Sequence, residues 1–506
     1  MSFNLATMLR ESALATPDKP LVLFAGTTLT YRQVDELSGR VAGSLAGMGL
    51  QRGDKVAVQL PNLPQFLLVY FGVLKAGMTV VPLNPLLIAR EIADHLSDSD
   101  AKLLVTFEMF AQEAVKGAAE VDGVRVLVVR APGSETLPEG TQPFEALLAA
   151  EDTGEILPTA SDDTAVLLYT SGTTGDPKGA ELTHFQLFMN CTTAGGLFGA
   201  SADDVTMAVL PLFHVFGLSS VLNVTVRHGG SMSLVPRFEA GAVIDALERD
   251  GVTNFLGVPT MYFALLQEDI SSRDLSRFRI AVSGGAAIPG EVIRAFEDKY
   301  GVVILEGYGL SESASTTTFN VSASERKVLS IGKRIWGLEV QIQDDDGRRL
   351  PPGPDSIGEI VIRGHNIMKG YYKKPEATAE AFRGGWFHSG DLGYEDSDGF
   401  FFIVDRKKDL VIRGGYNVYP REVEEVLYTH PAVAEAAVIG RPDPRLGEEV
   451  VAYVALKPGA TADPEEVVGF CRERMAAYKY PRVVQVLPEL PKGPTGKILK
   501  KELRRA

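Results

Sequence analysis

The sequence predicts an α/β protein with a large N-terminal domain of mainly parallel sheets and helices, followed by a small α+β C-terminal domain. Its 506 residues exceed what one hydrophobic core usually serves, so we expect more than one domain. Short β-branched runs alternate with helical stretches over about the first 400 residues, a pattern typical of parallel sheets. With 45% hydrophobic and 23% charged residues, the composition is that of an ordinary globular protein.

The N-terminal part predicts helices and strands in alternation. One helix begins after Thr30, which forms a capping-box pair with Gln33. Its apolar residues keep a spacing of three to four: Val34, Leu37, Val41, Leu45 and Met48. Buried strands are predicted at 55–60, 80–85, 101–107, 124–129, 164–170, 251–259 and 279–285. This order favours sheets whose strands are connected by helices.

The bulk properties exclude several classes of partner. The longest apolar run begins at Phe66 and contains Lys75, so it predicts a buried helix and no integral membrane segment. The formal net charge of −15 argues against a nucleic-acid partner, because phosphate backbones require clustered Lys and Arg. Cys191 and Cys471 form neither a disulfide framework nor a metal-binding spacing, and the N-terminus lacks the pattern of a signal peptide. We therefore expect a cytoplasmic protein.

Near residue 400 the sequence changes from an aromatic strand to a run of charges and a glycine pair, and we place a domain boundary at Asp405 to Asp409. Beyond it, helices are predicted at 420–430, which has a proline near its first turn, and at 464–475. Strands are predicted at 433–440, 450–456 and 482–487. These elements predict the small α+β domain.

The loop YTSGTTGDPKG, residues 169–179, contains groups that suit a polyphosphate. Its glycines allow backbone N–H groups to converge on an anion, and its remaining groups are the hydroxyls of Thr170, Ser171, Thr173 and Thr174 and the charge of Lys178. The spacing of glycine to lysine is not that of a Walker A loop. From composition alone, a flexible surface turn explains the loop equally well.

The segment 167–184 that contains this loop resembles the phosphate loop of the adenylate-forming superfamily, which includes acyl-CoA synthetases, aryl-CoA ligases, luciferases and peptide-synthetase adenylation domains. Other segments resemble further motifs of the superfamily, in the family order: LKAGMTVVPLNP, LPLFHVFGL, VSGGAAIP, EGYGLSESA, GEIVIRGHNIMKGYYKKPEATAEAF, WFHSGDLG, DRKKDLVIRGGYNVYPREVEEVL and PKGPTGKILKKEL. They extend from about residue 75 to 501, and the chain most resembles the fatty acyl-CoA synthetases.

The resemblance implies a reaction in two halves. A carboxylate attacks the α-phosphorus of ATP, releasing pyrophosphate and leaving an acyl-adenylate, and the thiol of CoA then takes the acyl group. Two anions must approach each other in the first half, so Mg²⁺ and positioned cations are needed. Glu312 matches the magnesium-associated glutamate of the family, and Ser311 is the hydroxyl before it. Gly172 belongs to the implied phosphate site, together with the hydroxyls and lysine named above.

The resemblance also assigns residues to the nucleotide site, to the hinge and to the CoA site. The implied adenine and ribose contacts are Gly284, Gly285, Ala286, Glu306, Gly307, Tyr308, Gly309, Ser311, Asp391 and Arg406. Lys497 matches the lysine that reaches the acyl and α-phosphate oxygens during adenylation. Because the thiol must later enter the same space, we expect a hinge at 406–409, centred on Lys408, between a large domain at 1–405 and a mobile small domain at 410–506. Gly414 and Gly415 would then leave room for the pantetheine arm of CoA.

The sequence narrows the acid substrate by two absences. Amino-acid-activating relatives have an aspartate where His214 stands, and malonate-type relatives have an arginine where Gly307 stands, so a monocarboxylic acid with an apolar tail is expected. His214 is expected to steer the carboxylate or gate the tail. The candidate pocket residues are Phe213, Val215, Phe216, Val258, Met261 and Tyr262. A fatty acid is our first hypothesis, although the motifs do not separate fatty from aryl acids.

Two alternatives share these motifs. The acyl group of the adenylate could pass to the phosphopantetheine of an acyl carrier protein, or a luciferase-like monooxygenase could oxidise the adenylate. The motifs do not predict the oligomeric state or the pathway.

Overall fold

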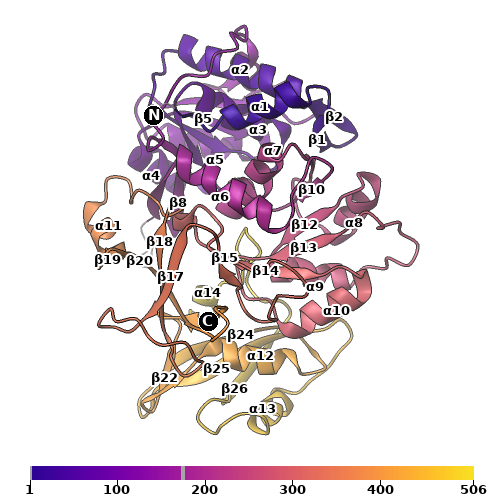
Figure 1. The fold of residues 1–506 in the computed structure, drawn as a ribbon, viewed down its shortest axis with the longest axis vertical. Coiled ribbons are helices and arrows are strands. Elements are labelled where there is room, and N and C mark those ends of the chain that lie inside the picture. Colours follow the sequence, from indigo (N-terminus) through magenta and orange to yellow (C-terminus); the bar gives the residue numbers. More distant parts are fainter. Residues whose placement is uncertain (1–2, 172–176, 506) are drawn as a thin grey trace.

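The computed structural model describes residues 3–171 and 177–505 and shows the expected α/β architecture (Figure 1). A seven-stranded sheet has the order β7-β6-β5-β3-β4-β8-β9 and is parallel except for the β8–β9 pair. Its strands are β3 (Lys55–Gln59), β4 (Thr79–Pro82), β5 (Ala101–Phe107), β6 (Arg125–Val129), β7 (Gln142–Pro143), β8 (Thr164–Ser171) and β9 (Pro177–Thr183). Alternation of strands and helices in the sequence therefore gave the correct sheet type.

A nine-stranded sheet of order β16-β15-β14-β13-β12-β10-β11-β1-β2 forms the second half of the large N-terminal part. Its parallel centre consists of β10 (Val205–Ala208), β11 (Ser231–Leu234), β12 (Asn254–Gly257), β13 (Ile280–Ser283), β14 (Ile304–Tyr308) and β1 (Pro20–Phe24). The edge strands β2 (Thr27–Thr30), β15 (Thr318–Phe319) and β16 (Lys333–Arg334) pair antiparallel. In the parallel centre of such a sheet, the carboxyl ends of neighbouring strands lie at the same edge. Ligands of open α/β sheets bind at this edge.

Helices cover both sheets; most bury their apolar faces in one large core, whereas α4 and α5 pack in a second, smaller cluster. They are α1 (Thr7–Ala15), α2 (Tyr31–Gly47), α3 (Pro64–Lys75), α4 (Ala89–Ser99), α5 (Ala111–Ala118), α6 (His184–Leu197), α7 (Val224–Arg227), α8 (Ala240–Arg249), α9 (Pro259–Leu266) and α10 (Gly290–Tyr300). The predicted capping box of Thr30 and Gln33 is present at the start of α2. The apolar run from Phe66 forms α3, whose Lys75 is buried in an ion pair of 2.7 Å with Asp35. No described helix is long and apolar enough to cross a membrane.

An antiparallel sheet of β17 (Leu338–Gln343), β18 (Gly358–Gly364), β19 (Phe382–Arg383), β20 (Trp386–Glu395) and β21 (Phe401–Arg406) flanks the two parallel sheets, with α11 (Pro375–Ala381) before β19. The alternation-based prediction of mainly parallel sheets did not anticipate this antiparallel part. Apart from the short helix α11 between β18 and β19, its strands follow one another through turns and loops, which allow direct antiparallel pairing.

The C-terminal part has its own sheet, formed by β22 (Val411–Arg413), β23 (Tyr416–Val418), β24 (Val433–Asp443), β25 (Gly447–Leu456) and β26 (Val483–Leu487). Its helices are α12 (Pro420–Tyr428), α13 (Pro464–Arg472) and α14 (Lys500–Leu503). Two small hydrophobic clusters, separate from the large core, hold these elements together. In Figure 1 this part, orange to yellow, lies below the parallel sheets.

Candidate active site

One large cleft lies where the C-terminal part meets the carboxyl ends of β13 and β14 and the β8–β9 hairpin. It has a volume of about 1940 Å³, whereas a pocket for one small ligand usually has about 300–1,000 Å³. The cleft therefore has room for a nucleotide and a second substrate together.

The predicted phosphate loop joins two antiparallel strands. Thr170 of β8 lies opposite Lys178 of β9 in the register, and both residues line the cleft. Gly172, Thr173 and Thr174 lie outside the described residues, as does the side chain of Ser171. The ends of the loop thus present a hydroxyl and an ammonium group to the cleft, the chemistry that a polyphosphate requires.

The predicted adenine residues follow the ends of two neighbouring strands. Gly284, Gly285 and Ala286 come after β13, whereas Glu306, Gly307 and Tyr308 end β14, and all six line the cleft. A Cβ atom on Gly284 would lie 3.1 Å from the Phe216 ring, so little room is left for a side chain there. Gly309 also lines the cleft, and a Cβ atom on it would overlap the carbonyl oxygen of Ser315.

The predicted ribose residues form a connected polar group. The Tyr308 hydroxyl donates to Oδ2 of Asp391 at 2.7 Å, and Nε of Arg406 lies 3.2 Å from Oδ1 of the same carboxylate. Asp391 is buried on β20, and Arg406 ends β21, so two strands of the antiparallel sheet position the pair. A hydroxyl-rich sugar would find both acceptor and donor groups here.

Glu306 differs from an ordinary surface carboxylate. It is buried at the end of β14, and its Oε2 atom has no hydrogen-bond partner. Burial raises its pKa to about 7, although the charge of Arg421 and a backbone N–H group at Ile288 oppose this rise. Glu306 is therefore partly protonated near neutral pH and can donate as well as accept.

The predicted magnesium residue, Glu312, lies in the short helical turn Ser311–Ser313 and lines the cleft. Its Oε1 atom accepts a hydrogen bond of 2.9 Å from the Tyr371 hydroxyl. Among the described residues no group of three or more His, Cys, Asp or Glu side chains could hold a metal ion. A single carboxylate fits Mg²⁺ well, because this ion usually takes one or two carboxylates and completes its shell with phosphate oxygens and water.

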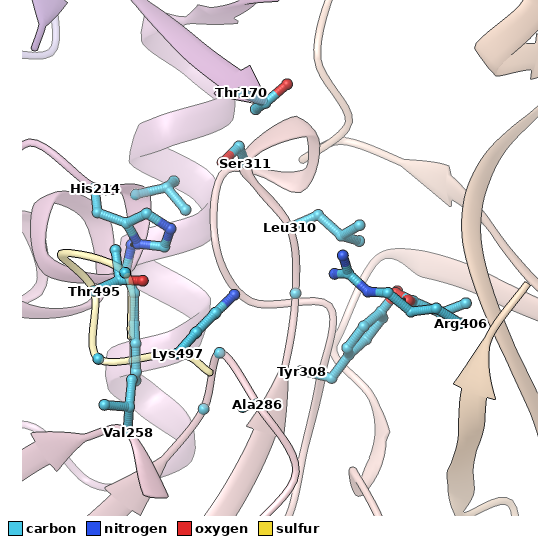
Figure 2. A pocket seen from close by; sticks show the side chains of 18 of the residues that line it. Thr170, His214, Val258, Ala286, Tyr308, Leu310, Ser311, Arg406, Thr495 and Lys497 are labelled. Atoms are coloured by element: carbon cyan, nitrogen blue, oxygen red, sulfur yellow. Dashed lines mark hydrogen bonds and ion pairs between the residues drawn. The ribbon is translucent and has the colours of Figure 1, made fainter. Parts of the chain in front are cut away.

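Lys497 enters the cleft from the C-terminal part. Figure 2 shows its side chain between His214 on one side and Tyr308 and Arg406 on the other. Burial and, second to it, the charge of Arg406 lower the pKa of Lys497 to about 8, and the charge of Asp391 opposes this change. The loop that carries this lysine is fixed by a hydrogen bond of 3.0 Å from the Thr260 hydroxyl to the carbonyl oxygen of Gly496.

His214 is neutral in this arrangement. Burial lowers its pKa to about 3, and the charge of Lys497 acts in the same direction. Its Nδ1 atom accepts a hydrogen bond of 3.3 Å from the backbone N–H group of Phe216, so Nε2 carries the proton. The side chain can therefore donate one hydrogen bond but brings no charge to a carboxylate.

Four of the predicted acyl-pocket residues, Phe213, Val215, Phe216 and Val258, line the cleft, whereas Met261 and Tyr262 do not. Tyr262 is fully buried between Phe255 and Phe296, and its hydroxyl donates to a backbone carbonyl oxygen at 2.6 Å. Both side chains are buried in the core, in the first turns of α9, and this helix packs against α8 and α10.

Sequence reasoning missed several buried residues of the cleft wall, among them Phe198, Ser220, Ser315 and Phe319. The rings of Phe198 and Phe319 lie 6.2 Å apart, and the hydroxyls of Ser220 and Ser315 are 2.7 Å apart. Ser220 lies in the π-helical segment Phe216–Asn223, just beyond the LPLFHVFGL motif, which was the only available signal.

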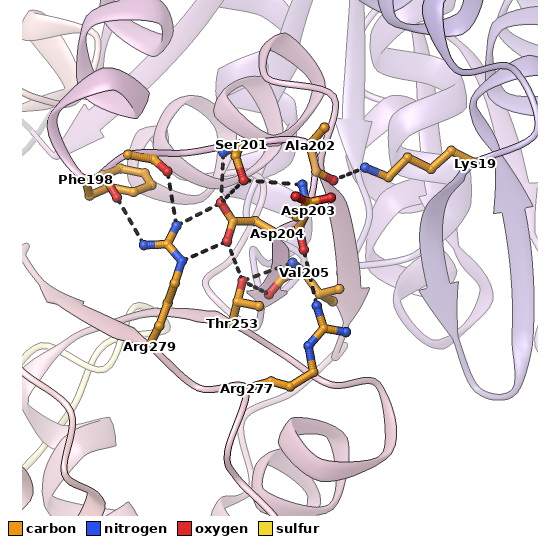
Figure 3. Close-up of polar contacts among 11 residues, drawn as sticks. Lys19, Phe198, Ser201, Ala202, Asp203, Asp204, Val205, Thr253, Arg277 and Arg279 are labelled. Atoms are coloured by element: carbon orange, nitrogen blue, oxygen red, sulfur yellow. Dashed lines mark hydrogen bonds and ion pairs between the residues drawn. The ribbon is translucent and has the colours of Figure 1, made fainter.

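A polar network behind the wall fixes the segment that carries Phe198 (Figure 3). Arg279, next to β13, donates to the Phe198 carbonyl oxygen at 3.3 Å and forms an ion pair of 2.8 Å with Asp204. The Thr253 hydroxyl donates to the same carboxylate at 2.8 Å. The end of α6 is thereby tied to the central sheet.

The predicted hinge and CoA residues are not together. Lys408 lies in the turn between β21 and β22 and lines the cleft. Gly414 and Gly415 lie in the exposed turn between β22 and β23, with φ values of +58° and +83°, and are not part of the cleft wall. The hinge motion that would bring the glycines to the cleft stays a prediction.

Comparisons with known proteins agree with this geometry. Residues 9–372 match the family described as AMP-binding enzyme, and residues 422–497 match the AMP-binding enzyme C-terminal domain. The chain is 38% identical to a long-chain-fatty-acid–CoA ligase of Bacillus subtilis (strain 168), over 99% of this chain and 94% of the relative. It is 39% identical to a feruloyl-CoA synthase of Amycolatopsis sp, over 97% of each chain. The crystal structure of the anthranilate CoA ligase AuaEII in complex with anthranoyl-AMP matches with a TM-score of 0.94 and 30% identity, over 100% of this chain and 97% of that one.

Proposed function

Since the chain belongs to the AMP-binding enzyme family and its relatives are acid–CoA ligases, we propose that it converts a monocarboxylic acid with an apolar tail into its CoA thioester through an acyl-adenylate. The observation that carries this proposal is the position of Lys497, whose side chain enters the nucleotide cleft near the Tyr308, Asp391 and Arg406 group. None of the relatives named above supports a carrier protein as the acceptor.

In the first half-reaction a carboxylate oxygen attacks the α-phosphorus of ATP, the bond to the bridging oxygen breaks, and pyrophosphate leaves. Lys497 and Arg406 supply positive charge beside the ribose site, where negative charge develops on the α-phosphate oxygens. Neutral His214 donates a hydrogen bond from its Nε2–H group to a carboxylate oxygen and so orients the acid. Because the imidazole carries no full charge, it does not weaken the nucleophilicity of the carboxylate in that way. Glu312 and the β- and γ-phosphates would hold Mg²⁺, which offsets the repulsion between the two anionic substrates.

In the second half-reaction the thiol sulfur of CoA attacks the acyl carbon, AMP leaves, and the thiol proton passes to solvent or to a base. Lys497 occupies the cleft in the structure described here. This side chain must therefore leave the cleft before the thiol can enter. Rotation about Lys408 would withdraw the lysine and bring the turn of Gly414 and Gly415 to the cleft. The pantetheine arm is narrow, and two glycines with positive φ leave the surface of this turn without side chains.

A fatty acid is the first candidate substrate. Phe213, Phe216 and Val258 give the cleft an apolar wall next to His214, and the buried Phe198 and Phe319 extend that wall. Such a surface binds an alkyl chain by removing apolar area from water.

An aryl acid with a polar ring substituent is the second candidate. The rings of Phe198 and Phe319 would pack against a ring, and the paired hydroxyls of Ser220 and Ser315 are the polar groups at this part of the wall. The feruloyl-CoA synthase relative is named for such an acid.

The test is a mass-spectrometric screen of purified protein with ATP, Mg²⁺ and a panel of straight-chain and hydroxylated aryl acids, with and without CoA. The proposal expects adenylate without CoA and thioester with it. A Ser220→Ala variant distinguishes the two candidates, because it should raise the KM of a hydroxylated aryl acid and leave that of a fatty acid unchanged. Adenylate that persists in the presence of CoA would contradict the proposed acceptor.

A further inference from the structure

The segment 369–372, within the KGYYKKPEAT stretch, has no role in the mechanism above, yet it is bound along the outer edge of β9. The backbone N–H group of Lys369 donates to the carbonyl oxygen of Glu181, and the N–H group of Glu181 donates to the carbonyl oxygen of Gly370, both at 2.9 Å. The N–H group of Tyr372 donates to the carbonyl oxygen of Gly179 at 2.8 Å. The segment is therefore held against β9, the strand that follows the phosphate loop.

The side chain of Tyr371 contacts two charged groups of the triphosphate site. Its hydroxyl donates to Oε1 of Glu312 at 2.9 Å, and Nζ of Lys178 lies 5.4 Å from the centre of its ring. All three residues line the cleft. Tyr371 is thus a bridge between the loop that carries the magnesium carboxylate and the loop that binds phosphate.

Each of the two Tyr371 contacts restricts the position of a charged side chain, either Glu312 or Lys178. A hydrogen bond to Oε1 fixes the rotation of the Glu312 carboxylate and leaves Oε2 free for a metal ion. A tyrosine hydroxyl is ordinarily protonated at physiological pH, so Tyr371 can donate this hydrogen bond. The ring face attracts the Lys178 ammonium group and limits the positions that this flexible side chain can adopt.

The neighbouring Tyr372 offers a natural contrast. Its hydroxyl donates to Asp100 at 2.8 Å, Lys373 also binds Asp100 at 2.6 Å, and neither Tyr372 nor Asp100 lines the cleft. Consecutive tyrosines of one segment therefore make the same kind of hydrogen bond to a carboxylate, but only one of these carboxylates faces the cleft.

We propose that Tyr371 is a positioning residue for Mg·ATP, holding the Glu312 carboxylate in its metal-binding orientation and the Lys178 ammonium group beside the phosphates. This inference rests on the proposed function. Groups that orient a metal ligand typically contribute about 10- to 100-fold to metal affinity.

The experiment measures ATP binding by isothermal titration calorimetry, without acid, at a series of Mg²⁺ concentrations and in EDTA. Tyr371→Phe removes only the hydroxyl, so it should raise the Mg²⁺ concentration for half-maximal ATP binding about tenfold while binding in EDTA stays unchanged. Tyr371→Leu also removes the ring and should weaken binding in EDTA as well, because the Lys178 contact is lost. Tyr372→Phe is the matched control and should bind as the wild type does.

Thermal unfolding of each variant separates positioning from folding. Equal Mg²⁺ dependence in wild type and Tyr371→Phe would overturn the inference, and so would a lowered Tm accompanied by an equal loss of binding in EDTA. Failure of the wild-type protein to bind ATP would instead overturn the proposed function and this inference together. An unchanged KM for the acid, beside a raised KM for Mg·ATP, would support the assignment in steady-state assays.

Discussion

Replacement of Lys497 by methionine tests the mechanism most directly, because it removes the ammonium group and keeps an unbranched apolar side chain of similar length. Removing one preorganised group that stabilises developing charge typically costs about 10²- to 10³-fold in rate. We expect a loss of that size in adenylate formation at pH 7. Thioester formation from supplied acyl-adenylate should be spared, because the lysine must leave the cleft before that step.

The pH dependence of kcat/KM for ATP gives a second test of the role of Lys497. Burial lowers the pKa of Lys497 to about 8, so the charged form is present below this pH and is lost as the pH rises through it. A group with this pKa is about 90% charged at pH 7 and about 10% charged at pH 9, so kcat/KM for ATP in the wild type should fall about tenfold between these values.

The assay is pyrophosphate exchange with an accepted acid, in parallel with mass-spectrometric detection of thioester from synthetic acyl-adenylate. In the Lys497→Met variant the decrease above pH 8 should disappear from the exchange profile. Persistence of the same decrease in the variant would assign it to another group, and equal loss of both half-reactions would refute the role given to the lysine.

Three further substitutions test the moving parts and the pocket. Thr260→Val removes the hydrogen bond to the Gly496 carbonyl oxygen, which contributes about 1 kcal/mol, so adenylation should slow about fivefold while thioester formation from supplied adenylate stays unchanged in the same two assays. Lys408→Pro should restrict the hinge and impair thioester formation selectively, and an unchanged second half-reaction in stopped-flow measurements would remove the case for rotation. Gly307→Ala places a Cβ atom 2.7 Å from the Phe319 ring, so the free energy of unfolding in urea should fall by about 1–3 kcal/mol, and an unaltered midpoint would mean that the ring moves freely.

The local elements were largely predictable, because their signals are contained in neighbouring residues. The capping box of Thr30 is present, and the predicted strands β3, β4, β5, β6, β8, β12 and β13 follow from β-branched runs bounded by turns. The antiparallel sheet of β17 to β21 was not predicted, because strand pairing depends on contacts between segments that are distant in the sequence.

The same division holds for the site. The motifs alone were sufficient to predict that Thr170, Lys178, Tyr308, Glu312, Asp391 and Lys497 serve one nucleotide, and the structure places all of them on one cleft. Their common location could not come from spacing, since Lys497 lies far along the chain from Lys178 and meets the cleft only because the C-terminal part packs over β13.

The sequence by itself thus determined the fold class and the family to which the motifs belong, whereas the apolar tail of the acid stays a prediction. Only the tertiary structure decided which apolar residues line the cleft. Tyr262 and Phe319 are both aromatic, yet one packs between two rings of the core and the other lines the cleft. The physical reason is that burial of an aromatic ring is favourable in either place, so composition cannot distinguish a core contact from a cleft wall.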